Sequence, residues 1–292
     1  MEGALTECAH APASDRLPTA KLTPQHAPER LFVSIPEETI VVAGYPKSGT
    51  TWVCRLLGQL IGCPVRGRLG DPDRDSIHKE GLERDSNLQV LKSHHQYPEL
   101  SDRVPLNRLV YVVRDVRDIV LSAAHYFPLF PNSHLGTVLR KVNFKGVISD
   151  HLLDCLSRNI DMMIRIVSQG DEERDWMHAP WDVHVNGYLG AQACVVLYED
   201  LLADTAGQCE RFTAHLGYSP SPEAIRAAVR DQNFKNVKRK FQNRGDATRA
   251  QFLRSGRSGE WQRVLTEDEQ HFLRERFRET LEALGYLESE RV

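Results

Sequence analysis

The chain has 292 residues, of which 41% are hydrophobic and 26% charged, and its formal net charge is −3. This length suits one large domain with a sizeable core, and the near-neutral charge excludes an overall basic field that would attract nucleic acid or an anionic membrane. No apolar run approaches the about 18 residues that span a bilayer, and residues 1–30 lack the apolar segment of a secretory signal. We therefore expect a soluble cytoplasmic protein with a flexible arm over residues 1–30 and a single domain over residues 31–292. Six scattered cysteines, without a C-x-x-C pair or zinc-like spacing, indicate free thiols.

The first half of the domain alternates between predicted strand and helix. Thr39–Ala43 is a short apolar run typical of a buried strand, and Trp52–Ile61 follows with helical periodicity. Leu88–Ser93 is predicted to be a short strand that ends at His94 and His95. Leu109–Val113 is a near-continuous apolar run typical of a strand buried on both faces. A helix is expected from Val116 to about Phe127.

Residues 66–87, in the first half, are expected to be loop. The second half is less regular, above all over residues 128–190. Later elements are predicted at His151–Val167 (helix), Ala193–Tyr198 (strand) and Thr205–Leu216 (helix). Capping signals at Ser221 and Thr266 predict two more helices, the last of which runs to Gly285. The alternation indicates an α/β fold, a P-loop-like three-layer sandwich with a mainly parallel central sheet flanked by helices.

The segment between the first strand and helix has the layout of a phosphate-binding loop. Gly44 and Gly49 have the spacing of the nucleotide-triphosphate P-loop, but Thr50 stands where that loop has its lysine, and the lysine lies inside the loop at Lys47. Backbone N–H groups and the positive end of a helix dipole converge on such a loop. Ligands of open α/β sheets bind beyond the carboxyl ends of the strands, which predicts one anion site shared by Lys47, Lys92–His95 and Arg114.

Tyr45–Trp52 reads Y-P-K-S-G-T-T-W and resembles the 5′-phosphosulfate loop of sulfotransferases. These enzymes (EC 2.8.2) use 3′-phosphoadenosine-5′-phosphosulfate (PAPS) as donor and release 3′-phosphoadenosine-5′-phosphate (PAP). The resemblance, to the soluble, cytosolic-type branch, implies a sulfotransferase domain over residues 31–292. It implies donor contacts from Lys47, Ser48, Gly49, Thr50, Thr51 and Trp52.

Two further segments resemble the parts of this family that bind the 3′-phosphate. Arg114 and Ser122 fit the pattern R-x-x-x-D-x-x-x-S, although Ser122 would lie about two helical turns from the strand end. Residues 252–261 resemble R-K-G-x-x-G-[DE]-W, which implies donor contacts from Arg254, Ser255 and Gly256. Ser255 stands where the family often has lysine, and Arg257 is a candidate to supply the missing charge.

Aromatic residues at three places resemble those that contact the adenine base in the family. They are Trp52, Tyr198 and Phe234, while Gln232 stands where the family often has threonine. The segment Trp181–Gly187 also resembles a recurrent W-x-x-H-V segment of the family.

The sequence Lys92-Ser93-His94 resembles the family's K-T-H. The resemblance implies that His94 is the general base, that Lys92 neutralises the transferring sulfonate, and that Lys47 stabilises the departing phosphate. Histidine suits this task because its ordinary pKa lies near the working pH. His95 is an alternative base, and neighbouring side chains of a strand point to opposite faces. No metal is required, because two lysines can balance the charge of the sulfonate.

Two other functions stay open from the sequence, a P-loop nucleotide kinase and a non-catalytic nucleotide-binding protein. The expected acceptor is a hydroxyl of a small molecule, bound by residues 66–87 and 123–178. Possible apolar lining residues, which would suit a phenol or an apolar alcohol, are Phe127, Phe130, Phe144 and Trp181. The oligomeric state is open.

Overall fold

A computed structural model describes residues 35, 38–70, 79–126, 150–171, 177–246 and 254–287, with backbone only for residues 150–155. Contacts divide the chain into residues 1–34 and a compact unit from Ile35 to Val292, and all that follows concerns the second unit. The arm expected over residues 1–30 lies outside the described residues.

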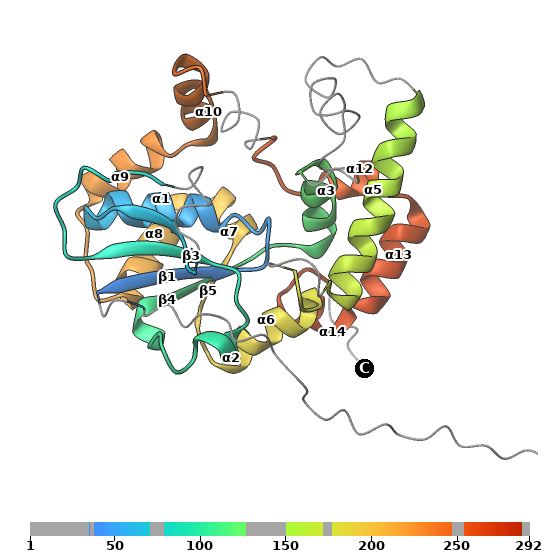
Figure 1. Cartoon of the computed structure of the whole chain (residues 1–292), viewed down its shortest axis with the longest axis horizontal. Helices are drawn as coiled ribbons and strands as arrows, with labels where there is room; N and C mark the ends of the chain where they lie inside the picture. Colours follow the sequence, from blue (N-terminus) through green and yellow to red (C-terminus); the bar gives the residue numbers. More distant parts are fainter. Residues whose placement is uncertain are drawn as a thin grey trace, which may run out of the picture. The chain divides into compact units, whose positions relative to one another are not determined.

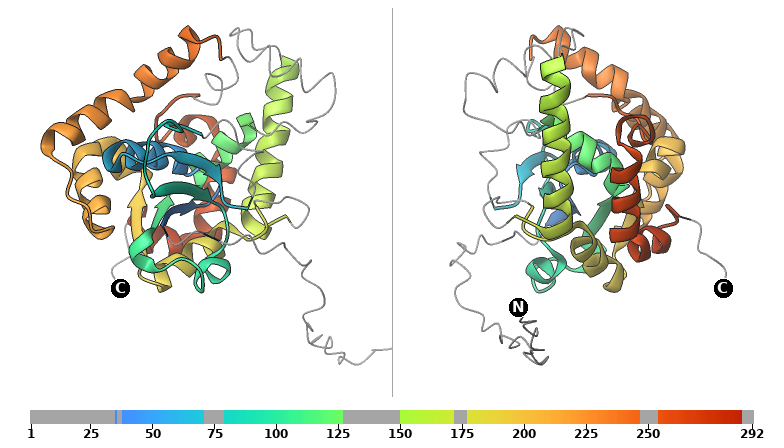
Figure 2. Two further views of the ribbon diagram at one scale, coloured as in Figure 1. Left: turned by 60° about the vertical axis from the view of Figure 1, so that its left-hand side comes forward. Right: turned by 90° about the vertical axis from the view of Figure 1, so that its right-hand side faces the viewer.

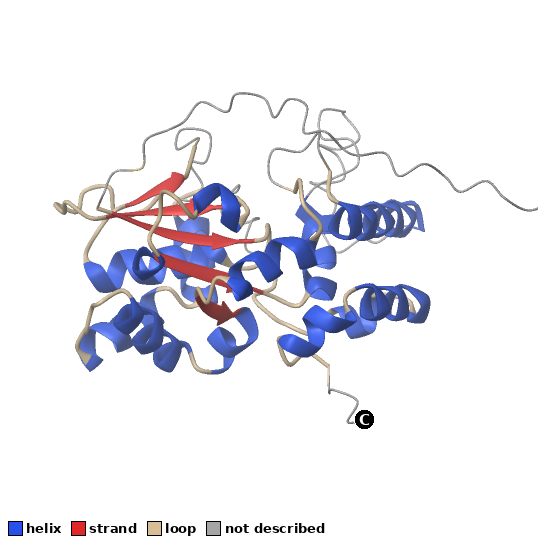
Figure 3. Ribbon diagram, turned by 90° about the horizontal axis from the view of Figure 1, so that it is seen from below, coloured by secondary structure: helices blue, strands red, loops and turns tan. Residues whose placement is uncertain are grey.

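Five parallel strands form the sheet, in the order β2-β3-β1-β4-β5 (Figures 1 and 3). Their bounds are β1 Thr39–Gly44, β2 Val65–Arg68, β3 Gln89–Ser93, β4 Leu109–Val113 and β5 Cys194–Leu197. The first strand in the sequence is thus central in the sheet, between β3 and β4. The described strands confirm the predicted parallel α/β architecture.

Helices cover both faces of the sheet. One face carries α1 (Thr50–Ile61), α8 (Thr205–His215) and α9 (Pro222–Asp231). The other carries α3 (Val116–Tyr126), α5 (Asp150–Gln169), α6 (Trp181–Gly190), α13 (Glu267–Arg276) and α14 (Arg278–Ala283). Figure 2 shows α5 beside α3, on the side of the sheet away from α9. The remaining described helices are α2 (Tyr97–Leu100), the short 3₁₀ turn Leu106–Arg108, α7 (Tyr198–Ala203), α10 (Phe234–Asn243) and α12 (Trp261–Val264).

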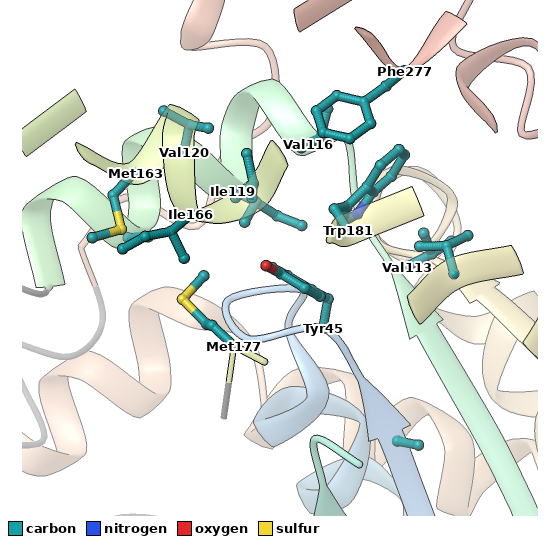
Figure 4. Packing of buried hydrophobic residues seen from close by; sticks show 14 of the residues in the cluster. Tyr45, Val113, Val116, Ile119, Val120, Met163, Ile166, Met177, Trp181 and Phe277 are labelled. Carbon is teal, nitrogen blue, oxygen red and sulfur yellow. The ribbon is translucent and has the colours of Figure 1, made fainter. Parts of the chain in front are cut away.

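Alternate side chains of the central strands feed two separate cores. Val41 and Tyr111 belong to the core beneath α3 and α6, whereas Val42 and Val112 belong to the core beneath α1 and α8. All four side chains are fully buried, as period-two alternation requires in a sheet covered on both faces. Figure 4 shows the first core at close range, where Tyr45 meets side chains from several helices.

The strand register places the predicted functional segments at one edge. Ala43 of β1 pairs with Ser93 of β3, and Gly44 pairs with Val112 of β4. Val113 of β4 pairs with Leu197 of β5. The next residues of all four strands therefore leave the sheet side by side, which is the carboxyl edge where ligands of such folds bind.

Four local expectations need correction. The edge strand β2 lies within the region expected to be loop, and α6 lies within the stretch expected to be irregular. Tyr198 opens α7 and is not part of β5. The last predicted helix is two helices, because Phe277 departs from helical geometry between α13 and α14. The caps at Ser221 and Thr266 are confirmed, since each side-chain oxygen accepts a backbone N–H of its helix.

Candidate functional site

The loop between β1 and α1 is tightly constrained. A Cβ at Gly44 would lie 2.6 Å from the carbonyl oxygen of Val112, so β1 could not approach β4 with a larger residue. Gly49 is the N-cap of α1 and has φ 97°, and a Cβ there would lie 2.6 Å from the Tyr198 ring. The first N–H groups of a helix lack intrahelical partners and favour anions. Ser48 adds a fully buried hydroxyl whose oxygen has no hydrogen-bond partner among the residues that the structure describes, which fits an anionic ligand at the loop.

Lys47 occupies an unusual backbone position at the tip of this loop. Its φ is 73°, a left-handed conformation that costs a non-glycine residue about 1–2 kcal/mol. The Lys47 Nζ lies 3.7 Å from the centre of the Tyr126 ring, at the end of α3. Burial, then the nearby positive charges of three cations, lowers the pKa of Lys47 to about 7. Those cations are Lys92, Arg114 and Arg254.

Arg114 joins three parts of the site. Its guanidinium donates to the carbonyl oxygen of Arg257 at 2.8 Å, and a longer contact of 3.5 Å reaches the carbonyl oxygen of Lys47. The guanidinium also lies 4.4 Å from the centre of the Tyr198 ring. Arg114 is 6% exposed, and within the described part of the chain its Nε has no hydrogen-bond partner. The side chain therefore fixes the loop and residues 254–261 to each other and keeps one buried donor available.

Residues 254–261 lie against α3 and present an anion-binding pair. Asp118 of α3 accepts the backbone N–H groups of Gly259 (2.6 Å) and Trp261 (3.4 Å). The carboxylate of Glu260 forms an ion pair with Arg254. It also accepts the Ser255 hydroxyl at 2.9 Å. Arg254 and Ser255, to which the family resemblance gives the 3′-phosphate, thus both donate to one carboxylate. A phosphate oxygen can accept from both side chains in the same way.

The predicted aromatic residues fall into two pairs of contacts. Trp52 and Tyr198 meet edge to face with ring centres 6.0 Å apart, over Gly49. Phe234 opens α10 and lies so close to Gly256, whose φ is 62°, that a Cβ there would overlap its ring. Gln232 is 5% exposed and donates to Gln59 and Glu80, so its amide is committed to a polar cluster on α1.

His94 and His95 are clearly different in their surroundings. The Nδ1 of His94 lies 2.6 Å from the carbonyl oxygen of Gly44, so Nδ1 carries the proton and Nε2 is an acceptor. Burial, with the positive charge of Lys92 next, holds the pKa of His94 well below its ordinary value. His95 instead lies within hydrogen-bond distance of the Ser93 hydroxyl and faces Gly70 near β2. His94 therefore combines a neutral ring with a hydrogen bond to the carbonyl at the start of the loop, whereas the ring of His95 lies against Ser93.

The sequence interpretation required chain curvature to bring Ser122 back toward the site. The structure does not show this curvature, because Ser122 lies in the middle of a regular α3, partly exposed. Asp118, Ser122 and His125 share one helix face by their spacing. Asp118 binds residues 259–261 and His125 feels the charge of Arg254. The face of α3 that carries Ser122 thus lies along the Arg254 segment, and this arrangement replaces the need for curvature.

Two contributors to the site were missed from the sequence. Tyr126 lies under the Lys47 ammonium, and Glu260 pairs with Arg254. Both are contacts between distant segments, and neither residue type signals such a role by spacing. In the sequence, Glu260 stands out only as the acidic residue of Gly259-Glu260-Trp261, which resembles the family's G-[DE]-W.

The expected acceptor lining is described only in part. Phe127, Phe130 and Phe144 lie outside the described residues. Trp181 is fully buried and packs edge to face on Phe277 at 5.3 Å, so it belongs to the core and does not line a pocket (Figure 4). Within the described ranges, no helix has the length and apolarity to cross a bilayer, and no group of three or more His, Cys, Asp or Glu residues is placed to hold a metal ion.

Comparison with known proteins identifies the family. Residues 71–285 match the family model of the sulfotransferase domain. The chain belongs to the sulfotransferase domain family. The matched range begins beyond the loop Tyr45–Trp52, so this assignment does not depend on the loop motif. The family resemblance predicted from the sequence is confirmed.

Other sulfotransferases are similar to this chain over most of its length. Human sulfotransferase 6B1 is 22% identical over 255 residues, covering 84% of this chain and 76% of the relative. Cytosolic sulfotransferase 1 of Danio rerio is 26% identical over 265 residues, covering 80% and 79%. The crystal structure of mouse sulfotransferase SULT7A1 complexed with PAP has a TM-score of 0.60 at 18% identity and covers 85% of each chain. Retinol dehydratase in a complex with retinol and PAP has a TM-score of 0.57 at 17% identity, covering 85% and 82%.

Proposed function

We propose that this sulfotransferase moves a sulfuryl group from PAPS to a hydroxyl of a small-molecule acceptor. The observation that carries the proposal is the meeting of four cations with one neutral histidine at the carboxyl edge of the sheet. Lys47 feels the charges of Lys92, Arg114 and Arg254, and His94 directs its unprotonated Nε2 away from the Gly44 carbonyl. The four cations suit a donor with two anionic ends, and the neutral histidine suits the role of a general base.

The residues present fit the donor at both of its phosphates. The buried, partnerless Ser48 hydroxyl and the start of α1, with Gly49, Thr50 and Thr51, suit the 5′-phosphosulfate. The guanidinium of Arg254 and the hydroxyl of Ser255 already converge on the Glu260 carboxylate, and we assign them to the 3′-phosphate. Arg114, Ser122 and the Gly256 backbone complete this end. Trp52, Tyr198 and Phe234 are assigned to the base.

The proposed reaction is an in-line transfer between two oxygen atoms. The acceptor oxygen forms a bond to sulfur as the bond from sulfur to the 5′-phosphate oxygen breaks, and PAP leaves. His94 Nε2 takes the proton of the acceptor hydroxyl. General-base catalysis of this kind accelerates a reaction by about 10²–10⁴-fold. Lys47 stabilises the charge on the departing phosphate oxygen, and Lys92 neutralises the equatorial sulfonate oxygens. The kinase alternative fits less well, because Thr50 stands where its lysine is needed.

The acceptor class is proposed from the relatives. A 3-beta-hydroxysteroid sulfotransferase of Cavia porcellus is 25% identical over 261 residues, and two neighbouring structures contain retinol or androsterone. We therefore propose that the acceptor is an apolar alcohol or phenol. We also propose that the enzyme acts in the cytoplasm, as the name of the Danio rerio relative suggests. Radiolabelled PAPS incubated with 2-naphthol, a 3β-hydroxysteroid and retinol, in EDTA, tests this. Labelled sulfate ester from at least one of them supports the function, and failure with all three contradicts the proposed acceptor class.

Binding of PAP is expected to draw a proton into the site at pH 8. Lys47 has a pKa of about 7 in the ligand-free protein, so it is mostly neutral at pH 8, where the phosphates of PAP are fully ionised. A bound phosphate raises that pKa, because an anion stabilises the ammonium form. Calorimetry of PAP binding in buffers of different ionisation enthalpy should show uptake of nearly one proton, and the affinity should fall as the pH rises from 7 to 9.

Lys47→Arg is the matched control for this proton. Arginine keeps its charge at every accessible pH, so the variant should bind PAP without proton uptake and with little dependence on pH between 7 and 9. Equal proton uptake by the variant and the natural protein would show that another group titrates.

A further inference from the structure

The backbone around His94 is held by α6, which the proposed reaction does not use. His184 is 3% exposed, and its Nε2 lies 3.2 Å from the carbonyl oxygen of His94. A carbonyl can only accept, so Nε2 of His184 carries the proton. Its Nδ1, 2.9 Å from the Tyr111 hydroxyl, must then accept from that hydroxyl. The tautomer of His184 is thus fixed by its two partners.

The ring of His94 is held from the start of the phosphate loop. Its Nδ1 donates to the carbonyl oxygen of Gly44, the last residue of β1, at 2.6 Å. Tyr111 lies beside this strand end, because Ala43 of β1 pairs with Tyr111 of β4. The ring and the backbone carbonyl of His94 are therefore each held by a separate hydrogen bond.

Three hydrogen bonds follow one another from β4 to the loop. The Tyr111 hydroxyl donates to Nδ1 of His184, Nε2 of His184 donates to the His94 carbonyl, and Nδ1 of His94 donates to the Gly44 carbonyl. Each bond has one possible direction of donation, so the three protons are assigned together. The Tyr111 and His184 rings are stacked at 5.7 Å, and the edge of Tyr45 meets His184 at 5.5 Å. Such packing leaves little room for another arrangement.

We propose that Tyr111 and His184 are positioning residues, which hold the proton of His94 on Nδ1 and its Nε2 toward the acceptor through this series of hydrogen bonds. The inference rests on the proposed function, in which His94 is the base. It adds a link between the donor loop and the base, because the Gly44 carbonyl at the start of the loop accepts from the His94 ring. A loop shifted out of place would release the His94 ring as well.

The turn after β3 explains why such support is needed. His94 and His95 lie between the end of β3 and Gln96, the N-cap of α2, so their carbonyls belong to neither a strand nor a helix. The Tyr188 hydroxyl donates to the next carbonyl, that of His95, at 2.6 Å. Tyr188 stacks on Tyr111 with ring centres 3.9 Å apart. Both tyrosines therefore support the turn from the same aromatic stack, but Tyr111 acts through His184 on the carbonyl of His94 itself, whereas Tyr188 holds the carbonyl of His95.

Tyr111→Phe and Tyr188→Phe form a matched pair that tests the proposal without an acceptor. Each removes one buried hydroxyl oxygen and keeps the stacked ring. Long-range ¹H–¹⁵N spectra of ¹⁵N-histidine-labelled protein, with His94→Gln for assignment, report the tautomer and titration of His94 between pH 4.5 and 8. In the natural protein we expect the proton on Nδ1 of His94 and on Nε2 of His184.

The two variants should then differ. Tyr111→Phe should leave His184 in mixed tautomers and raise the pKa of His94, since a less fixed ring is better hydrated. Tyr188→Phe should keep both tautomers. Both variants retain the charged and titratable groups that act on His94, which are Lys92, Arg68 and His184. Tautomers and titration in Tyr111→Phe that match the natural protein would overturn the proposal.

Conservative replacement of His184 supplies a second test. Glutamine can still donate to the His94 carbonyl, whereas leucine of similar size cannot. His184→Gln should keep the His94 proton on Nδ1, and His184→Leu should lose this preference. PAP binding and the unfolding temperature of each variant separate a local effect from general damage. If the natural protein fails to bind PAP, the proposed function fails. If it binds PAP but Tyr111→Phe and Tyr188→Phe show the same tautomers and titration of His94, only the positioning role fails.

Discussion

Replacing His94 with glutamine is expected to lower sulfuryl-transfer turnover by about 10²–10⁴-fold, the range that a general base contributes. Glutamine keeps a polar group of similar size and can still donate to the Gly44 carbonyl, but it cannot take a proton. The affinity for PAP should stay within about threefold, because His94 contacts the loop backbone and is not assigned to either phosphate. The measurements are steady-state kinetics with the acceptor that the labelled-donor assay identifies, and calorimetry with PAP.

His95→Gln is the control for this change. His95 is the adjacent residue and has the same chemistry, but its ring is engaged with Ser93 on the β2 side of the turn. The variant should keep turnover within about one order of magnitude of the natural protein, well short of the loss of a general base. A loss in His95→Gln that equals or exceeds the loss in His94→Gln would assign the base to His95, the alternative that the sequence left open.

Replacing Arg254 with glutamine is expected to remove most of the preference for PAP over AMP. Arg254 and Ser255 converge on one carboxylate, and we assign them to the 3′-phosphate, which AMP lacks. Loss of a hydrogen bond to a charged group costs about 1.5–3 kcal/mol, so PAP should bind about 10- to 100-fold more weakly. AMP binding should change little, and competitive titrations of the two nucleotides would measure both.

Arg257→Gln distinguishes this role from a general loss of positive charge. Only the backbone carbonyl of Arg257 has a defined contact in the site, with Arg114. The side chain is exposed, so its removal should weaken PAP binding by less than about threefold at physiological salt. Equal losses of PAP affinity in the two variants would mean that Arg257 supplies the charge that the family places at the position of Ser255.

Local signals explain why the phosphate loop and most strands could be predicted. An apolar run that ends in a glycine-bracketed loop leaves few alternatives to strand, turn and helix, and Thr39–Gly44 followed by Thr50–Ile61 is the result. The rule that parallel strands end at one edge then predicts from the sequence that Lys47, His94 and Arg114 lie together. The register of β1 with β3 and β4 bears this out.

The parts that could not be predicted depend on contacts between distant segments. The edge strand Val65–Arg68 has two arginines in four residues and no apolar run, so pairing with β3 makes it a strand. The support of the His94 carbonyl comes from His184, 90 positions along the chain. Its W-x-x-H-V motif was visible in the sequence, but no spacing rule connects a buried histidine to a carbonyl that far away.

Calorimetric titration with PAP, beside AMP and ATP, first in EDTA and then with magnesium, tests the central claim most directly. We expect tight metal-free binding of PAP, weaker binding of AMP and ATP, and little effect of magnesium. This result follows because Lys47, Arg114 and Arg254 supply the positive charge that the two phosphates need. Magnesium-dependent binding of ATP, without preference for the 3′-phosphate, would contradict a PAPS donor and return the kinase interpretation.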